Sequence, residues 1–422
     1  MNDGLRIAAT LAIFGSVLVL VVVRPRKWPE AVWTVLGAAL VLLLGLVHPP
    51  DAWAAVLAGK AALLFLLSLL ALAVLVGKSG FFEWAAALCV RSSRGRATVL
   101  YRNMFLLGTL VTATMSLDTT AVLLTPVVLV IVRRLGLPGA PFVVLCAFIA
   151  NVGSLILPIS NLTNLLFAEA FDISFASFAL RMLAPQVAAL AVTYAALRWW
   201  FRDDLRGALD VARLADPARA IVSRGYFRAS VVVLGLVLVG YFVAPLAGVE
   251  PYAVAFGGVA ILAVVGAATG RVQLGALREI PWGVFPFVLG MFVIVRAVED
   301  LGIVAVASRW VAVLADHPWT GPAFLAGATA FASNVANNLP AALFARTIIG
   351  PAHAASLLPF AALIGADAGS MVTPLGSLAT ILVLAIARRD GIELTNQRFV
   401  ALGLPLSALV VAAATLALLI VR

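Results

Sequence analysis

The stretch ANVGSLILPISNLTNLL (150–166) aligns without a gap on ADAGSMVTPLGSLATIL (366–382), which lies 216 residues further along the chain. Six of the seventeen aligned positions are identical, among them a Gly-Ser pair and a proline. Internal repeats that carry glycine, proline and polar residues inside apolar segments are typical of secondary transporters, in which such interruptions form the binding site. The two stretches therefore predict a protein built from two related halves around a site in the membrane.

A second pair of segments extends the repeat at the same offset. SLDTTAVLLTP (116–126) falls opposite ASNVANNLPAA (332–342), and this alignment sets Asp118 against Asn334. We expect each of these two residues to lie at the tip of a re-entrant hairpin. The repeat therefore predicts that both halves share the same sequence of elements.

The composition identifies the class of protein. Of the 422 residues, 64% are hydrophobic and 11% are charged, with a mean hydropathy of +1.12, whereas a soluble protein is about 25% charged. Many apolar runs reach the roughly 20 residues that span a bilayer, so we expect an all-α polytopic membrane protein. The clear full spans are expected near residues 5–23, 31–47, 61–77, 180–201, 229–247, 251–269, 283–299 and 400–421. The first of these lacks a convincing cleavage site, so it is expected to remain as a span.

Two long apolar regions are interrupted by polar residues, proline and glycine. Residues 97–134 are too long for one span and are expected to form a hairpin that enters and leaves on one face, followed by a span at 141–170 that is broken at mid-membrane. The second half repeats this plan with a hairpin at 320–347 and a broken span at 354–387. Non-helical backbone at this depth is tolerated only where it is buried in protein or lines an aqueous cavity.

The distribution of basic residues orients the chain in the membrane. If the N-terminus is outside, the cytoplasmic segments contain 21 of the 29 lysines and arginines, six of them between Arg202 and Arg228. Each half then has about five spans and one hairpin, so the halves have inverted topology and both termini lie outside. We expect the first inverted repeat at 1–201, a cytoplasmic linker with a short solvated helix at 202–228, and the second repeat at 229–422.

Several other kinds of protein are excluded. Cys89 and Cys146 are too few for a disulfide framework or a closed thiolate metal site, so no metal or other cofactor is expected. The chain has no phosphate-binding loop, and we do not expect it to be an enzyme. The net charge of +10 follows from the membrane topology and does not indicate nucleic-acid binding.

Asp118 and Asp367 are the expected proton-coupling residues. Ionisable residues are costly inside a membrane and mark functional sites, and both lie at predicted helix breaks, where half-helix ends and free carbonyl groups surround a substrate or ion. The repeat sets Asn151 against Asp367, so each half contributes one carboxyl group and one amide in swapped order. Burial disfavours the charged form of a carboxyl group, which allows proton exchange near neutral pH. Capping of a half-helix is the alternative role.

Amide and hydroxyl side chains at the breaks are the candidates for binding a substrate. Three asparagines occur within five residues just before Pro340, and amides both donate and accept hydrogen bonds, which suits a neutral polyhydroxyl solute as well as a cation. The alternative is a network that ties the helices together or satisfies freed backbone groups. The expected substrate-binding residues are Asn151, Ser154, Asn161, Asn334, Asn337, Asn338, Ser370, Thr373 and Ser377.

Five motifs together resemble one family. They are GFFEWAA (80–86), DTTAVLLTP (118–126), the Gly-Ser, Pro-Ile and Ser-Asn-Leu elements of NVGSLILPISNL (151–162), SNVANNLP (333–340) and GADAGSMVTPLGSLAT (365–380). Their order and spacing are similar to those of the arsenite efflux permease family of the ArsB type, within the ion transporter superfamily. In one departure, the hairpin carries Leu117-Asp118-Thr119-Thr120 where the family pattern is Asn-Asp-Gly-Ala.

The resemblance implies efflux of arsenite and antimonite as neutral trihydroxides, driven by inward proton movement through alternating access in the bacterial inner membrane. It also implies that a cytoplasmic ATPase subunit is a candidate partner. A sodium-coupled carboxylate or sodium/proton transporter of the same superfamily is the alternative, but no arginine falls in the predicted breaks. An intramembrane aspartyl protease also uses two embedded aspartates. Here Gly-Ala precedes Asp367, where such enzymes have Gly-x-Gly.

Overall fold

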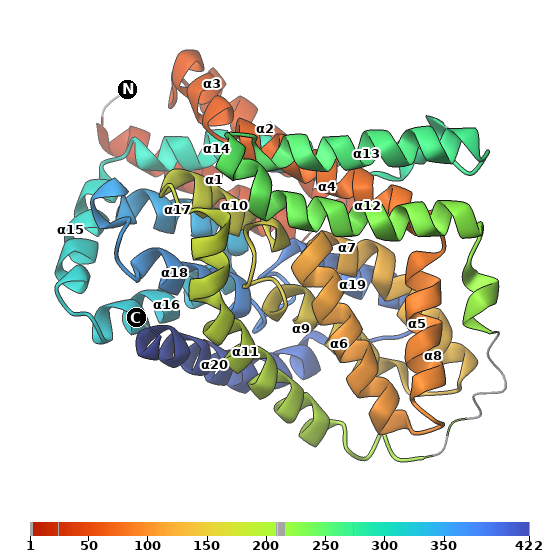
Figure 1. The fold of residues 1–422 in the computed structure, drawn as a ribbon. Coiled ribbons are helices and arrows are strands. Elements are labelled where there is room, and N and C mark those ends of the chain that lie inside the picture. The colour runs from red at the N-terminus through yellow and green to blue at the C-terminus, as the bar shows by residue number, and fades with distance from the viewer. Residues whose placement is uncertain (1–2, 24, 208, 210–215, 273, 422) are drawn as a thin grey trace.

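The computed structural model describes residues 3–23, 25–207, 209, 216–272 and 274–421, and all regular elements among them are helices (Figure 1). Six of these helices are long and apolar enough to cross a membrane. They are α1 (Asp3–Val23), α4 (Lys60–Gly77), α11 (Phe175–Trp200), α12 (Arg224–Val243), α13 (Pro251–Ala268) and α20 (Asn396–Ile420). Shorter helices complete the frame: α2 (Glu30–Leu43), α3 (Pro49–Ala58), α5 (Phe81–Ser92), α14 (Val284–Glu299) and α15 (Ile303–Ala315).

The two expected hairpins and two broken helices lie between these spans. The hairpins are α6 (Ala97–Met115) with α7 (Leu117–Thr119), η2 (Thr120–Leu124) and α8 (Thr125–Arg134), and α16 (Thr320–Ala336) with α17 (Asn338–Ile349). The broken helices are α9 (Gly139–Val152), η3 (Pro158–Ser160) and α10 (Leu162–Ala170), and α18 (Leu358–Leu363), η9 (Ile364–Ala368) and α19 (Leu378–Arg389). The all-α polytopic architecture predicted from the sequence is confirmed.

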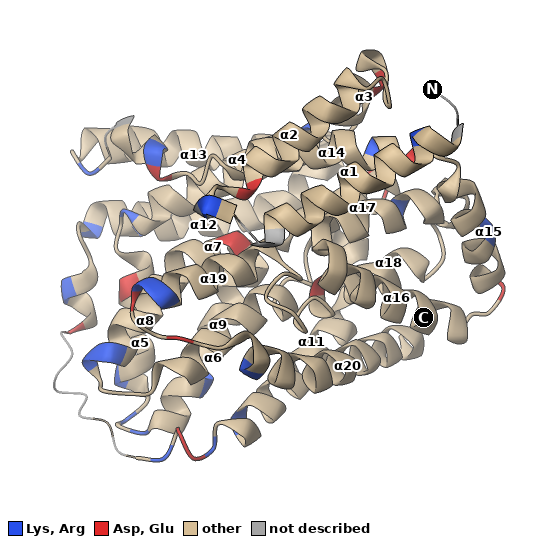
Figure 2. Ribbon diagram, turned by 180° about the vertical axis from the view of Figure 1, so that it is seen from behind, with Lys and Arg blue, Asp and Glu red and all other residues tan. Residues whose placement is uncertain are grey.

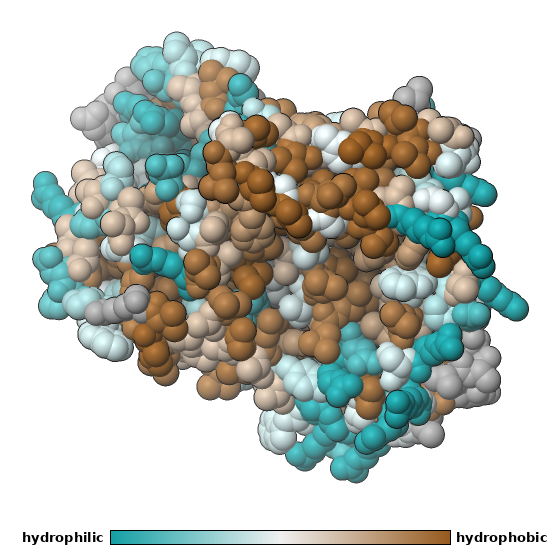
Figure 3. Space-filling view, viewed as in Figure 1, coloured by the Kyte–Doolittle hydropathy of each residue, from teal (hydrophilic) through white to brown (hydrophobic). Residues whose placement is uncertain are grey.

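The surface carries the signature of a membrane protein. Hydrophobic residues form a broad band across the middle of the face in Figure 3, and hydrophilic residues gather toward its upper left and lower right. Basic residues are concentrated at the end of the molecule that holds α5, α8 and the linker, while the interior ribbons are almost free of charge (Figure 2). This pattern is what a bilayer imposes on a polytopic protein with one basic face.

The linker between the halves packs on α5. Its described part contains a short 3-10 turn, η5 (Pro217–Ala220), and the backbone N–H of Val222 donates to the Ser79 carbonyl oxygen at 3.3 Å. The short solvated helix predicted at 202–228 falls partly on residues 208 and 210–215, which lie outside the described residues.

The two broken helices repeat each other in backbone conformation. Asn161, which begins α10, has φ −150° and ψ 144°, and Ser377, which begins α19, has φ −149° and ψ 143°. Gly153 and Gly369, where the first segments end, are also alike at φ −70° and −74°. The offset of 216 residues predicted from the sequence is therefore the structural offset of these two elements.

The hairpins correspond at a different offset. Each turns at a single residue with positive φ, Ser116 at 92° and Asn337 at 76°, and each of these residues caps the following helix. The predicted pairing of Asp118 with Asn334 is therefore wrong by five residues. Asn334 is not at a tip but in the last turn of α16, because the low identity between the hairpins could not fix their alignment.

The two broken helices run antiparallel. The end of α9 contacts the start of α19, where Asn151 Nδ2 donates to Thr380 Oγ1 at 2.9 Å. The beginning of α9 lies at the other end of α19, because Gly139 packs against Ile392. This antiparallel arrangement brings half-helix ends of both broken helices together in the interior.

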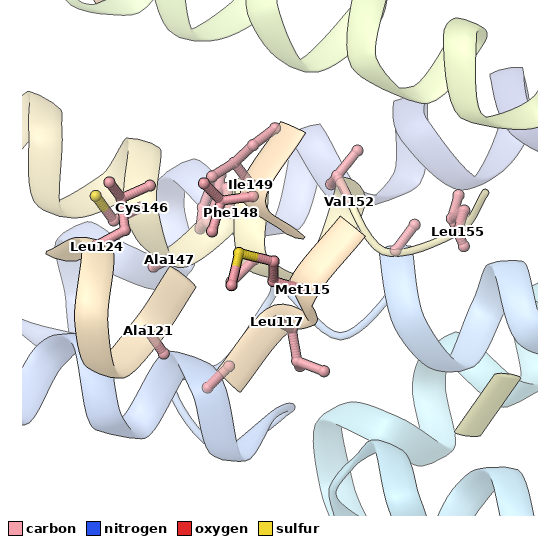
Figure 4. Packing of buried hydrophobic residues seen from close by; sticks show 14 of the residues in the cluster. Met115, Leu117, Ala121, Leu124, Cys146, Ala147, Phe148, Ile149, Val152 and Leu155 are labelled. Carbon is pink, nitrogen blue, oxygen red and sulfur yellow. The ribbon is translucent and has the colours of Figure 1, made fainter. Parts of the chain in front are cut away.

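Apolar packing holds the first hairpin against α9. Met115, Leu117 and Leu124 of the hairpin are all buried and lie close to Cys146 and Phe148 of α9 (Figure 4). Each such side chain contributes about 1.5–3 kcal/mol when it is buried from water. In the bilayer the same close packing fixes the position of the tip.

Candidate functional site

A small cavity lies where both hairpin tips meet the second segments of both broken helices. Its volume of about 40 Å³ leaves room for roughly three water-sized molecules. Its polar lining consists of Asp118, Asn161, Thr163, Asn337 and Asn338. Its apolar lining includes Leu66 of α4, Val284, Phe287 and Val288 of α14, and Leu117, Leu162, Leu339 and Leu378 beside the breaks. We call this space the central cavity.

Asp118 provides the carboxyl group in the lining of the central cavity. It lies in the short helix α7, where the Ser116 hydroxyl accepts a hydrogen bond from the Thr119 N–H at 3.5 Å. Asp118 is 7% exposed, and its carboxyl group has no hydrogen-bond partner among the described residues. Because α7 is followed by a π-helical turn at 120–124, a feature frequent at functional sites, the local backbone departs from a regular helix at this carboxyl group.

Asp367 is the second buried carboxyl group and also lies in a π-helical turn, η9. The Thr163 hydroxyl donates to its Oδ1 at 2.7 Å, and Asn338 interacts with the same carboxyl group. Its Oδ2 atom is buried and has no hydrogen-bond partner among the described residues. Asp367 is therefore connected to the central cavity through two of the residues that line it.

Two asparagines combine capping with exposure to the cavity. Asn161 accepts from the Thr163 N–H at 3.4 Å and caps α10, while its buried Nδ2 has no partner among the described residues. Asn337 caps α17 through the Leu339 N–H at 3.4 Å and donates to the Leu375 carbonyl oxygen at 3.1 Å. An unpaired buried amide is costly, so the Asn161 Nδ2 atom is a donor available to a ligand.

Three of the predicted residues form a different cluster, at the crossing of α9 and α19. Asn151 Nδ2 donates to the Ala147 carbonyl oxygen and to Thr380 Oγ1, both at 2.9 Å. The Ser370 hydroxyl donates to Asn151 Oδ1 at 3.3 Å, and the Ser154 hydroxyl donates to the Asn151 carbonyl oxygen at 2.6 Å. All three side chains are buried and do not line the central cavity. Their hydrogen bonds join the two halves.

Asn334 and Thr373 hold the loop that interrupts the second broken helix. Asn334 Oδ1 accepts from the N–H groups of Val372 and Thr373, both at 2.9 Å, and its Nδ2 donates to the carbonyl oxygens of Ala330 and Gly369 at 2.8 and 2.7 Å. The Thr373 hydroxyl donates to the Asn334 carbonyl oxygen at 2.9 Å. The amide of Asn334 is thus fully used within the protein, and neither residue lines the central cavity.

The remaining predicted residue, Ser377, begins α19 next to the cavity. Its hydroxyl is buried without a partner among the described residues, and the following residue, Leu378, lines the cavity. Thr163 and Thr380 belong to the hydroxyl and amide side chains at the breaks but are absent from the expected substrate-binding residues; their hydroxyl groups bond Asp367 and Asn151 across the repeats. Their positions in the first turn after each break are the sequence signal that marks them.

The cysteines are not arranged to bind a thiophilic ligand. Cys146 is buried in the apolar layer of Figure 4, and Cys89 lies on α5. Burial raises the pKa of the Cys89 thiol to about 11, so this thiol stays protonated at neutral pH and is a poor ligand. The described residues include no group of three or more histidine, cysteine or acidic side chains that could hold a metal ion.

Two solved transporters share the fold. The YdaH transporter of Alcanivorax borkumensis aligns with a TM-score of 0.59 and 17% identity over 86% of this chain and 85% of that one. The antimetabolite efflux pump MtrF of Neisseria gonorrhoeae aligns with a TM-score of 0.56 and 14% identity over 85% of this chain and 80% of that one. At such low identities the likeness concerns the fold alone.

Sequence comparison gives a closer relation. Residues 9–421 match the family model described as "Arsenical pump membrane protein". The arsenical pump membrane proteins of Escherichia coli strain K12 and of Yersinia enterocolitica are 35% and 34% identical to this chain over 396 residues, which is 91% of this chain and 92% of each relative. The match extends over both hairpins and both broken helices, so the chain belongs to the arsenical pump membrane protein family.

Proposed function

We propose that this protein exports arsenite and antimonite as neutral trihydroxides and that inward proton movement drives the export. The observation that carries the proposal is the central cavity, which combines one carboxyl group and three amides with no basic side chain among the described residues that line it. A neutral triol donates hydrogen bonds to carboxyl and amide oxygens and accepts them from amide N–H groups. The family membership supplies the arsenical substrate.

The substrate is held by the residues of the cavity rather than by thiols. Asp118 offers oxygen acceptors, Asn161 offers an unpaired amide N–H, and Asn337 and Asn338 complete the polar wall. The small volume limits the cavity to a solute with a few non-hydrogen atoms. Of the residues predicted from the sequence, Asn151, Ser154, Asn334, Ser370 and Thr373 then act by positioning the breaks, while Ser377 lies at the edge of the cavity.

Proton coupling is assigned to Asp118 and Asp367. Both carboxyl groups are buried in the membrane region, and neither has a basic partner within ion-pair distance among the described residues. An isolated buried charge is strongly disfavoured, so each group must take up a proton when it leaves water and release it on return. Alternating access of the site to the two faces then links proton entry to substrate exit.

A sodium-coupled carboxylate or sodium/proton transporter of the same superfamily is the second candidate, on the resemblance described above. An anionic substrate requires arginine or lysine, or helix N-termini, facing its charge. The N-terminal ends of α10, α17 and α19 do face the cavity. Its described lining, however, has no basic side chain and includes the acidic Asp118, which favours the neutral trihydroxide.

The membrane topology is part of the proposal. We place residues 1–201 and 229–422 as inverted repeats, the linker at 202–228 in the cytoplasm, and both termini outside, in the inner membrane of a bacterium. The basic end of the molecule in Figure 2 supports the cytoplasmic assignment of that face. We also place the docking site of a cytoplasmic ATPase subunit on the linker, because the linker is the segment between spans with the most arginines.

Flux measurements in everted membrane vesicles test the assignment. With an imposed proton gradient, arsenite and antimonite should accumulate, whereas sodium and citrate should not. Asp118→Asn and Asp367→Asn should each abolish gradient-driven uptake with the protein still folded. Asp300→Asn is the matched control, because Asp300 pairs with Arg296 at 3.0 Å away from the cavity and should retain transport. Full activity of both site variants would refute proton carriage by these carboxyl groups.

A further inference from the structure

A second, larger cavity lies beside the central one along the same pair of helices. It has a volume of about 360 Å³ and is open to the surface. Its lining includes Ala61 and Phe65 of α4, Pro158 of η3, and Leu165 and Glu169 of α10, together with Glu250 before α13. We call this space the vestibule.

The vestibule and the central cavity are lined by neighbouring side chains of the same two helices. Each of these helices changes from one cavity to the other within a few residues, and α4 packs directly against α10. On α4, Phe65 lines the vestibule and Leu66 the central cavity; on α10, Leu165 lines the vestibule and Leu162 the central cavity. Residues three apart lie on the same side of an α-helix and rise only about 4.5 Å, so the two cavities approach each other closely along this face of α10.

The side chains of α4 and α10 that lie between the two cavities are apolar. Phe65 and Leu66 are buried at 3% and 4% exposure, and Leu162 and Leu165 pack against the same hydrophobic cluster as Leu66. We call these four side chains the gate layer. Apolar side chains can separate by rotamer changes or by small helix shifts without the loss of a hydrogen bond. The gate layer is therefore suited to open between the central cavity and the vestibule.

The vestibule opens at the end of α4 that is remote from the basic face. At the opposite end of α4, Lys78 pairs with Glu279. The vestibule itself is bordered by three carboxylates, of Glu169, Asp172 and Glu250. Such an entrance favours cations and leaves neutral solutes unaffected, while it repels anions. It therefore suits the release of a neutral hydroxide and the entry of a proton.

We propose that the α4–α10 interface is the outward path of the substrate, with the gate layer as the outer gate and the vestibule as the exit chamber. This proposal rests on the proposed function for the identity of the solute, while the path itself is a property of the two cavities. Opening requires that α10, with Leu162 and Leu165, move away from Phe65 and Leu66 of α4. The substrate then passes from Asp118 and Asn161 to the outer face.

Thiol labelling tests the path without any arsenical. In a Cys89→Ser/Cys146→Ser background, Ser174→Cys reports the vestibule, which its side chain lines, and Asn161→Cys reports the central cavity. A membrane-impermeant cationic thiosulfonate added to intact cells should label Ser174→Cys rapidly and Asn161→Cys slowly. Leu165→Ala should accelerate labelling of Asn161→Cys about tenfold or more, because truncation of a packed leucine removes much of the layer. Leu378→Cys, which lines the same cavity, replaces Asn161→Cys if that variant does not fold.

Leu180 provides the matched control, since it is a 70% exposed leucine on the outer surface of α11. Leu180→Ala should not change the labelling rate, and Leu165→Trp should block arsenite efflux while Leu180→Trp should not. Equal labelling of Asn161→Cys with Leu165→Ala and Leu180→Ala, or labelling of Ser174→Cys only from the cytoplasmic side, would overturn the path. The expected labelling in a protein that moves no arsenite would support the path and refute the proposed function.

Discussion

Replacing Asn334 with alanine should destabilise the protein more than replacing Asn164, although both side chains bridge the loop of a broken helix. Asn164 Nδ2 donates to the carbonyl oxygens of Ser154 and Leu157 at 2.6 and 3.1 Å. Asn334 Nδ2 likewise donates to two carbonyl oxygens, and its Oδ1 atom accepts from two backbone N–H groups as well. The two substitutions therefore differ mainly by these two N–H groups.

The difference in stability between the two variants follows from the two N–H groups that lose their partner in Asn334→Ala. A buried N–H group that loses its partner costs about 1–3 kcal/mol. The N–H groups of Val372 and Thr373 are half-buried, so the low end applies to each, and Asn334→Ala should cost about 2 kcal/mol more than Asn164→Ala. Carbonyl oxygens that lose one donor are better tolerated. The loop at 369–377 should then lose its conformation, and transport should fail even though Asn334 does not line the central cavity.

The measurement is the thermal unfolding of both variants in the same detergent, followed by fluorescence-detected size exclusion, with arsenite resistance of cells as the functional readout. Asn334→Ala should unfold at a clearly lower temperature than Asn164→Ala. An equal or smaller loss for Asn334→Ala would refute the positioning role. If Asn334→Ala has normal stability but loses substrate binding, Asn334 contacts the substrate and does not only position the loop.

Three further outcomes are expected. The Cys89→Ser/Cys146→Ser double variant should export arsenite at the parental rate in everted vesicles, and loss of arsenite binding with intact folding would contradict a site made of oxygen and amide groups. Arg133→Asp should remove the contact with the Asp390 carboxylate, which lies 2.7 Å from Arg133, and should lower arsenite flux in the same assay. The Arg133→Asp/Asp390→Arg exchange should restore that flux. Gly403→Ala should abolish accumulation of folded protein on size exclusion, because an added Cβ would lie 2.0 Å from the Met371 carbonyl oxygen.

The sequence predicted six of the eight expected spans at a length that crosses a membrane, whereas the spans expected at 31–47 and 283–299 are the shorter helices α2 and α14. The prediction succeeds because hydropathy and charge act on whole segments, where single errors average out. The same holds for the broken helices, in which the glycines of the Gly-Ser pairs and the residues that begin the second helical segments have nearly identical dihedral angles. The hairpins could not be aligned in this way. Their correspondence depends on one residue with positive φ in each, Ser116 and Asn337, and these differ in type.

The sequence also could not distinguish the polar residues that line the cavity from those that hold the loops. Asn334 and Asn337 are three residues apart on one motif, yet the first holds a loop and the second lines the cavity. Their roles depend on where the loop at 369–377 returns, which is a tertiary contact between segments distant in sequence. The apolar part of the cavity, such as Leu66 and Phe287, resembles every other span residue in an apolar chain and gave no signal.

The thinness of the gate layer has an electrical consequence. If water fills the vestibule, the vestibule has the same electrical potential as the outer face. The membrane voltage then falls over two regions. One is the gate layer of Phe65, Leu66, Leu162 and Leu165, and the other is the protein between the central cavity and the opposite surface. A charge that crosses the full voltage gains or loses about 2.3 kcal/mol per 100 mV. A proton that crosses the thin gate layer therefore does only a small share of this work, and most of the work is done between the central cavity and the opposite surface, so the transport rate should depend on voltage as well as on the pH difference.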